Sequence, residues 1–307
     1  MTTRISSFAQ YQLTQSQMAQ TQQRLQDLQV QLSSGMKAQR YSGLSPDASQ
    51  LINLESTLQR TDQYTSGNNT VNLRLQTMET SVSSAFDTAS SLKTLLVNAL
   101  NGTNAGDLAL NQTAQNMMDQ LQQTLNAKIG DRYLFSGTAT DTPPVDFSDP
   151  SFTAPPGVYP SSADTSYYQG DSTKLSSRIA DNYDLTWGVT ANEPGFEELS
   201  RALHLTATAS TSPTDTNRLQ DALSVVNQAI SDLPDIRSRI GSAQKSIDDA
   251  NTQHTDVTTY LNQSISDIKA VDIPSAMTQL SSEQTLLEAS YSTVSRLSQL
   301  NLASFLH

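Results

Sequence analysis

The 307-residue chain contains no cysteine, one tryptophan and only 6% aromatic residues. Without cysteine there are no disulfide bonds, thiolate metal sites or cysteine nucleophiles. No apolar run reaches the roughly 18 residues that a membrane-spanning helix requires. The opening stretch MTTRISSFAQYQLTQSQMAQ has a single basic residue, Arg4, and no continuous apolar core. It therefore lacks the pattern of a cleaved secretory signal peptide.

Basic residues are also scarce, with 18 lysines and arginines against 30 acidic residues and a net charge of -12. A chain with this balance cannot neutralise phosphates along a groove, which argues against nucleic acid and against an anionic membrane surface as partners. The sequence has no HExxH, Walker loop, GxSxG or dinucleotide-binding motif. We therefore expect no enzymatic activity, no cofactor and no metal site.

Two groups of residues allow both a structural and a functional interpretation. His254 occupies a repeated apolar position and is either a packed core histidine or a proton switch or metal ligand. Because no second histidine or carboxylate cluster lies at ligand spacing, packing is the favoured interpretation. Tyr159, Tyr167, Tyr168 and Trp187 form either a binding face or the small core of an insert. The second interpretation is the more common one for such residues.

Both ends of the chain carry an apolar residue at every seventh position. The N-terminal row is Tyr11, Met18, Leu25 and Leu32, and the C-terminal row is Ile273, Leu280, Leu287 and Val294. A heptad repeat keeps one seam of a helix facing a neighbouring helix, so the two ends are predicted to pack side by side. Companion positions such as Thr14, Thr21, Glu283 and Ser290 are polar. We therefore expect residues 1–40 and 272–307 to be disordered in the monomer and to become helical on assembly.

Apolar residues at helical spacing predict helices over about 4–32, 46–100, 108–129 and 215–268. One pair of rows is Leu75, Val82, Ala89, Leu96 with Met78, Ala85, Leu92, Ala99, and the longest row is Leu219, Val226, Leu233, Ile240, Ile247, His254, Leu261, Ile268. These rows predict a coiled-coil seam between the two halves of the chain.

A different composition separates the two halves. Seven of the 11 prolines lie between residues 138 and 194, together with the single tryptophan. Short segments at Ser166–Gln169, Ser177–Ile179 and Tyr183–Thr190 are typical of strands. The predicted fold is mainly α, an elongated antiparallel helical rod (a coiled-coil bundle) formed by both chain halves, with a small β-rich insert at its tip. The predicted domains are 1–45 with 270–307 (terminal assembly), 46–137 with 195–269 (helical rod) and 138–194 (insert).

Four segments resemble one known family. They are LQVQLSSGMKAQRYSG (28–43), DRYLFSGT (131–138), YYQGD (167–171) and VDIPSAMTQLSSEQTLLEASYSTVSRLSQLNLASFL (271–306). Alone, LSSG or YxGD is a weak signal, but the order of all four is specific. The sequence is thus similar to bacterial flagellins and their hook-associated relatives, in particular to those of the hook–filament junction (the hook-associated protein 3 group).

This resemblance implies an extracellular structural subunit of the bacterial flagellum, exported without a cleaved signal by the flagellar type III system and held by an export chaperone before secretion. It implies self-association in a ring-like layer, with hook-associated protein 1 on the hook side and flagellin on the filament side. The terminal helices would form the inner tube, and the insert would face solvent. The alternatives are a filament flagellin or another type III-secreted coiled-coil protein.

The assembly interface is predicted to consist of the eight terminal heptad residues and four apolar neighbours. The full set is Phe8, Tyr11, Met18, Leu25, Leu32, Ile273, Leu280, Leu287, Val294, Leu297, Leu302 and Phe305.

Overall fold

The computed structural model describes residues 2–102, 109–153 and 157–303, and within these ranges it describes side chains from residue 12 to residue 296. This part of the chain is mainly α-helical and carries two small antiparallel sheets, as the heptad rows and the insert predicted. The chain divides into two compact units. The first unit comprises Met1–Arg60 and Val257–His307, and the second comprises Thr61–Asp256.

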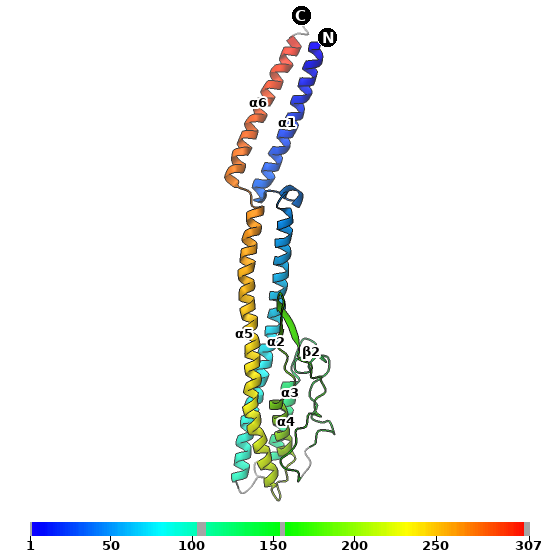
Figure 1. Cartoon of the computed structure of the whole chain (residues 1–307), viewed down its shortest axis with the longest axis vertical. Coiled ribbons are helices and arrows are strands. Elements are labelled where there is room, and N and C mark those ends of the chain that lie inside the picture. The colour runs from blue at the N-terminus through cyan, green and yellow to red at the C-terminus, as the bar shows by residue number, and fades with distance from the viewer. Residues whose placement is uncertain (1, 103–108, 154–156, 304–307) are drawn as a thin grey trace. The chain divides into compact units, whose positions relative to one another are not determined.

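The first unit is built on the antiparallel pair α1 (Thr2–Ser34) and α6 (Ile273–Ala303), shown in Figure 1. It also contains the start of α2 (Ala48–Asn101) and the end of α5 (Thr216–Lys269). A short 3-10 helix, Tyr41–Leu44, lies between α1 and α2. The predicted terminal pairing is therefore confirmed in a single chain. The predicted disorder of the free ends and the predicted domain boundaries stay predictions.

The second unit is organised by the remaining lengths of α2 and α5, which run antiparallel (Figure 1). Asn68 of α2 donates a 2.9 Å hydrogen bond to Asn251 of α5, and Arg237 of α5 pairs with Glu79 of α2 at 3.2 Å. The α2 heptad rows and the α5 row from Leu219 to Ile247 are buried throughout. The coiled-coil seam predicted from their spacing is therefore confirmed.

Two shorter helices and two hairpins complete the second unit. α3 (Leu110–Leu125) packs against α4 (Pro194–Ala207). One hairpin pairs β1 (Lys128–Ile129) with β2 (Arg132–Tyr133), and the other pairs β3 (Ser176–Ala180) with β4 (Tyr183–Thr186). The helix predicted over 108–129 ends earlier than expected, at Leu125, because the β1–β2 hairpin begins three residues later.

The prediction of a strand at Ser166–Gln169 is wrong. This segment forms only an isolated bridge between Val145 and Tyr168. Its backbone turns at once, since the amide of Tyr168 donates to the carbonyl of Thr165 at 3.0 Å. The strand-like composition instead reflects burial, because the Tyr167 ring is fully enclosed.

The core of the insert is continuous with the core of the helices. The rings of Phe135 and Phe196 of α4 meet edge-on, with their centroids 5.6 Å apart. The centroid of the Tyr167 ring lies 5.1–5.2 Å from those of Phe147 and Phe152. Trp187 is also buried. Tyr167 and Trp187 are therefore core residues, as favoured from their composition, and stabilise the insert by burying large apolar areas.

Candidate assembly interface

The seam between α1 and α6 buries few side chains. Among the side chains that the structure describes, Thr21, Leu25 and Leu28 are buried on α1, and Ala276 is the buried residue of α6. Of these, Thr21 and Ala276 contribute little apolar area, so the seam is narrower than a coiled coil with apolar residues at every core position. The half-polar pattern of the sequence is therefore visible in the packing.

The structure places the predicted interface residues in three ways. Leu25 is buried in the seam, and Met18, Leu32, Leu280, Leu287 and Val294 are half-buried along the helix pair. Ile273, the first residue of α6, is 51% exposed, whereas Ala276 is buried in the seam. The side chains of Phe8, Tyr11, Leu297, Leu302 and Phe305 lie outside the described residues. The assembly role of the whole set stays a prediction.

Polar contacts fix the register of the two terminal helices. Arg24 of α1 forms an ion pair with Glu283 of α6 at 2.9 Å through two nitrogen–oxygen contacts, and Gln22 donates to the hydroxyl of Tyr291 at 2.7 Å. Exposed ion pairs are worth about 0–1 kcal/mol each. They align α1 with α6 but do not replace the missing apolar burial.

The LSSG segment ends α1 with a left-handed turn. Gly35 has φ +71°, and its amide donates to the carbonyl of Gln31 at 2.8 Å. Glycine adopts this conformation without the steric cost that a side chain would add, which explains its place directly after the helix. The Ser34 hydroxyl donates to the carbonyl of Val30 at 2.7 Å. The motif is therefore a helix stop that redirects the chain toward α2.

The two linkers of the first unit meet directly after this stop, in a contact that we call the joint. The amide of Lys37 donates to the carbonyl of Lys269 at 2.7 Å, and the amide of Val271 donates to the carbonyl of Gly35 at 2.9 Å. These bonds enclose an antiparallel bridge between Met36 and Ala270. The linker before α2 and the linker before α6 are thereby held together by backbone atoms.

A side-chain cluster reinforces the joint. Glu55 of α2 accepts a 2.6 Å hydrogen bond from Tyr41 and an ion pair from Lys269. The bond from Lys269, followed by the bond from Tyr41, lowers the pKa of Glu55, whereas the same carboxylate raises the pKa of Tyr41. No periodic feature of the sequence indicated this cluster.

Large apolar side chains remain exposed around the first unit. Met277, Ile273 and Leu286 of α6 are at least half-exposed, and Leu13 and Val30 of α1 are also exposed. Isolated exposed apolar residues are ordinary, but a helix pair that leaves this many beside a narrow seam has surface left for a partner. The exposed surface that these side chains form is apolar and lies on two helices.

The two motifs of the insert interlock in the second unit. The amide of Asp171 donates to the carbonyl of Ser136 at 3.1 Å, and the hydroxyl of Thr138 donates to the Asp171 carboxylate. The bond from Thr138, with another from the amide of Thr173, lowers the pKa of Asp171 to about 2. Gly137 has φ +68°, and a Cβ built there would lie 2.2 Å from the Asp171 carbonyl oxygen. The YLFSGT and YYQGD motifs are thus a structural lock.

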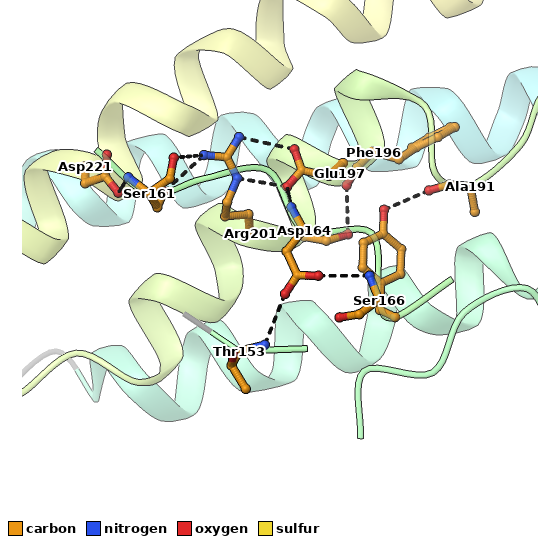
Figure 2. A network of polar contacts seen from close by, with 11 residues as sticks. Thr153, Ser161, Asp164, Ser166, Ala191, Phe196, Glu197, Arg201 and Asp221 are labelled. Atoms are coloured by element: carbon orange, nitrogen blue, oxygen red, sulfur yellow. Dashed lines mark hydrogen bonds and ion pairs between the residues drawn. The ribbon is translucent and has the colours of Figure 1, made fainter. Parts of the chain in front are cut away.

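A buried ion pair anchors the loop that precedes the YYQGD motif to α4 and α5. Arg201 binds Glu197 through two contacts of 2.8 and 3.1 Å, and it also donates to the backbone and hydroxyl oxygens of Ser161 at 3.0 Å (Figure 2). Asp221 of α5 accepts from the amide of Ser161, and Glu197 accepts from the amide of Asp164. Within the described residues, the charged groups of this network have hydrogen-bond partners, so they hold the loop against α4 and α5.

His254 is buried where the sequence placed it, in the α5 heptad row. Its Nε2 lies 2.8 Å from the carbonyl oxygen of Ile179, and its ring stacks on Tyr64 at 5.6 Å. The packed interpretation is therefore confirmed. Within the described residues, no three His, Cys, Asp or Glu side chains are grouped as a metal site would require. In the same part of the chain, no helix is both long and apolar enough to cross a membrane.

Both ends of the chain match models of one family. Residues 5–140 match the bacterial flagellin N-terminal helical region, and residues 223–306 match the bacterial flagellin C-terminal helical region. The chain belongs to the bacterial flagellin family. As a member it is a structural component of the flagellum, not an enzyme, and associates with other flagellar components. No curated protein sequence matches the chain.

Solved structures share the fold at low sequence identity. FlgL from Bacillus cereus is 16% identical with a TM-score of 0.57, and the match covers 70% of this chain and 99% of that one. A putative flagellar hook-associated protein from Vibrio parahaemolyticus is 17% identical, with a TM-score of 0.56 and coverage of 73% and 97%. FlgL from Xanthomonas campestris is 15% identical, with a TM-score of 0.56 and coverage of 69% and 99%.

Proposed function

We propose that this member of the flagellin family is the subunit that joins the hook-side adapter to the flagellin filament. The observation that carries the proposal is the fold. A structure named as a putative flagellar hook-associated protein and two structures named FlgL match 69–73% of this chain over 97–99% of their own length. The family models at both ends support a flagellar role but do not distinguish a junction subunit from a filament subunit.

The proposed interface is the pair α1 and α6, through the twelve residues named from the sequence. Its narrow seam and the exposed apolar side chains of α6 suit helices that complete their packing against neighbouring copies. We expect a ring-like layer of copies, with hook-associated protein 1 on one side and flagellin on the other. The subunit would be extracellular and exported by the flagellar type III system, with a chaperone covering the terminal helices before export.

The low apolar burial of the first unit also supports the proposal that the ends order on assembly. Its buried apolar side chains, within the described residues, are Leu25, Leu28, Leu44, Leu51, Leu261 and Ala276. Ordering a residue costs about 1–2 kcal/mol of backbone entropy, so helices with so little burial are marginal alone. Hydrogen exchange on a verified monomer tests this, and strong protection throughout α1 and α6 would contradict it.

Immunogold electron microscopy of intact flagella, with antibody against the insert, tests the junction assignment. One band of label where the hook meets the filament is the expected result. Label along the whole filament would instead identify a filament flagellin, the alternative that the family models leave open. If immunoblots detect the protein in these flagella but no gold label binds, the solvent-facing position of the insert would be contradicted.

A further inference from the structure

The charge of this chain is divided unevenly between its two units. The first unit contains seven basic and seven acidic residues, which are Arg4, Arg24, Lys37, Arg40, Arg60, Lys269 and Arg296 with Asp27, Asp47, Glu55, Asp267, Asp272, Glu283 and Glu288. Of the 18 basic and 30 acidic residues of the chain, the other 11 and 23 lie in the second unit, which therefore carries the whole net charge of -12. Two copies of the chain repel each other through their second units and not through their first units.

Exposed apolar side chains follow the opposite distribution. Among the side chains that the structure describes, fourteen large hydrophobic ones are exposed, and ten of them belong to the first unit, although it is the smaller one. The other four, in the second unit, are Leu73, Val97, Val158 and Tyr183. An apolar surface without net charge can be buried against a copy of itself without bringing like charges together.

Part of this apolar surface lies on α5, outside the terminal helices α1 and α6. A heptad row of α5 is buried throughout the second unit, at Ala229, Ile236, Ala243 and Ala250. Val257 is the next residue of this row, but it belongs to the first unit and is 42% exposed. Tyr260 follows three residues later, on the same side of the helix, and is 70% exposed. A core position of the heptad is thus left open on α5, beside an exposed aromatic ring.

We propose that a second copy of this chain docks on α5 around Val257 and Tyr260, and that repulsion between the second units limits how firmly the copies associate. Charge selects this occupant, since residues 257–266 contain no charged side chain and the unit that carries them is neutral. Tyrosine is also enriched in contacts between proteins. The proposal rests on the proposed ring-like layer, and it adds a contact outside α1 and α6 and a dependence on ionic strength.

A site-specific cross-link tests the contact. The chain has no cysteine, so Tyr260→Cys introduces a single thiol, to which a benzophenone maleimide is attached in isolated flagella. Illumination should yield a covalent dimer of the chain. Tyr183→Cys, at a 45% exposed tyrosine of the second unit, is the matched control and should yield several-fold less dimer. Val257→Cys is tested in parallel, in case Tyr260→Cys prevents incorporation. Absence of a dimer from both first-unit positions, equal dimer from Tyr183→Cys, or products with a different protein alone would overturn the proposal.

Two triple variants, each lacking three negative charges, test the role of the second unit. One neutralises exposed carboxylates of the second unit, through Asp87→Asn, Asp235→Asn and Asp248→Asn. The other neutralises exposed carboxylates of the first unit, through Asp27→Asn, Asp47→Asn and Glu288→Gln. Isolated flagella are washed at low ionic strength, where charges about 30 Å apart still interact. We expect the second-unit variant to be released about fivefold less than the wild type, because its copies repel each other less.

The first-unit variant should be released more than the wild type, because its first unit becomes positively charged and repels the first unit of the next copy. Both variants should melt as the wild type does, since the substituted carboxylates are exposed. Equal release of the two variants would show that only the total charge matters and would overturn the proposal, as would greater release of the second-unit variant. Immunogold position is scored on the same flagella, so failure of the junction assignment is distinguishable from failure of this contact.

Discussion

The hydroxyl of Tyr41 donates a 2.6 Å hydrogen bond to Oε2 of Glu55, and Lys269 pairs with Oε1 of the same carboxylate. One side chain of α2 therefore holds both the segment that follows α1 and the last residue of α5. The backbone bonds of the joint lie directly beside it, at Lys37 and Val271. Within the first unit, this cluster is the contact that ties the linkers of both terminal helices to α2 and α5.

Replacement Glu55→Gln should loosen the joint. The loss is expected to be less than about 1 kcal/mol, because the cluster is partly exposed to solvent. Amide hydrogen exchange at Lys37 and Val271 should become faster, while exchange in the second unit stays unchanged. Glu79→Gln, which removes an exposed ion pair with Arg237 elsewhere, is the matched control. Unchanged exchange at both amides in Glu55→Gln would show that the backbone bonds alone hold the joint.

The same cluster predicts a pH dependence. Because the pKa of Glu55 is lowered in the folded chain from 4.5, its contribution is fully present above pH 4.5 and is lost as pH falls below that value. At neutral pH the amides of Lys37 and Val271 should therefore exchange more slowly in the wild type than in Glu55→Gln. In acid the exchange rates of the two proteins should become equal. A difference that persists at pH 2 would contradict this account.

The terminal seam predicts the effect of Leu287→Asp on assembly. Leu287 is half-buried along the α1–α6 pair, and a charge placed there would have to be desolvated on packing. We expect incorporation into flagella to be abolished while the second unit melts as in the wild type. Ala289→Asp puts the same charge on an exposed position of α6 and should be tolerated better. Normal flagella from cells carrying only Leu287→Asp would refute the interface.

Heptad spacing was sufficient to predict the long helices and their buried faces, since residues such as Leu75 and Ile247 repeat the period over many turns. The same spacing placed Ile273 in the terminal seam, and in the single chain this side chain is 51% exposed. A repeat counted in sevens does not reveal at which turn two helices begin to touch, and Ala276 is the first buried residue of α6.

The joint could not be predicted in this way. Glu55 and Lys269 are 214 positions apart, and a contact at that separation leaves no local pattern. The insert motifs were recognised by resemblance, but their interlocking role depends on the close approach of Gly137 to Asp171.

The close approach of Gly137 to Asp171 predicts that two glycine substitutions differ strongly in their effect on stability. Gly137→Ala would place a Cβ 2.2 Å from the Asp171 carbonyl oxygen and would also strain a φ of +68°. Gly130→Ala meets nothing within 4 Å and carries only the strain of its φ of +60°. We expect about 1–2 kcal/mol of destabilisation for Gly130→Ala and roughly 3 kcal/mol or more for Gly137→Ala.

Urea unfolding followed by fluorescence of Trp187 measures this difference, because the single tryptophan lies in the second unit. Equal losses of unfolding free energy for the two variants would mean that the contact between the two motifs shifts to make room for the new methyl group. A small loss for both would contradict the structural role assigned to the YLFSGT and YYQGD motifs.

Glu198 of α4 predicts a stability change between acidic and alkaline pH. Its Oε2 is buried and has no hydrogen-bond partner within the described residues. Burial, followed by the charge of Asp232 on α5, raises the pKa of Glu198 from 4.5 to about 7. A raised pKa means that the group favours folding fully below pH 4.5 and that this contribution is lost as pH rises through about 7.

Glu198→Gln should therefore stabilise the second unit at pH 8 and leave its stability at pH 4 nearly unchanged. After allowance for solvent screening we expect a gain of about 1–2 kcal/mol at pH 8. Urea unfolding at both pH values, read through Trp187, measures the gain. Asp87→Asn removes one negative charge from an exposed site of α2 in the same unit and controls for net charge. A gain equal at both pH values, or matched by Asp87→Asn, would show that the ionisation of Glu198 is not its cause.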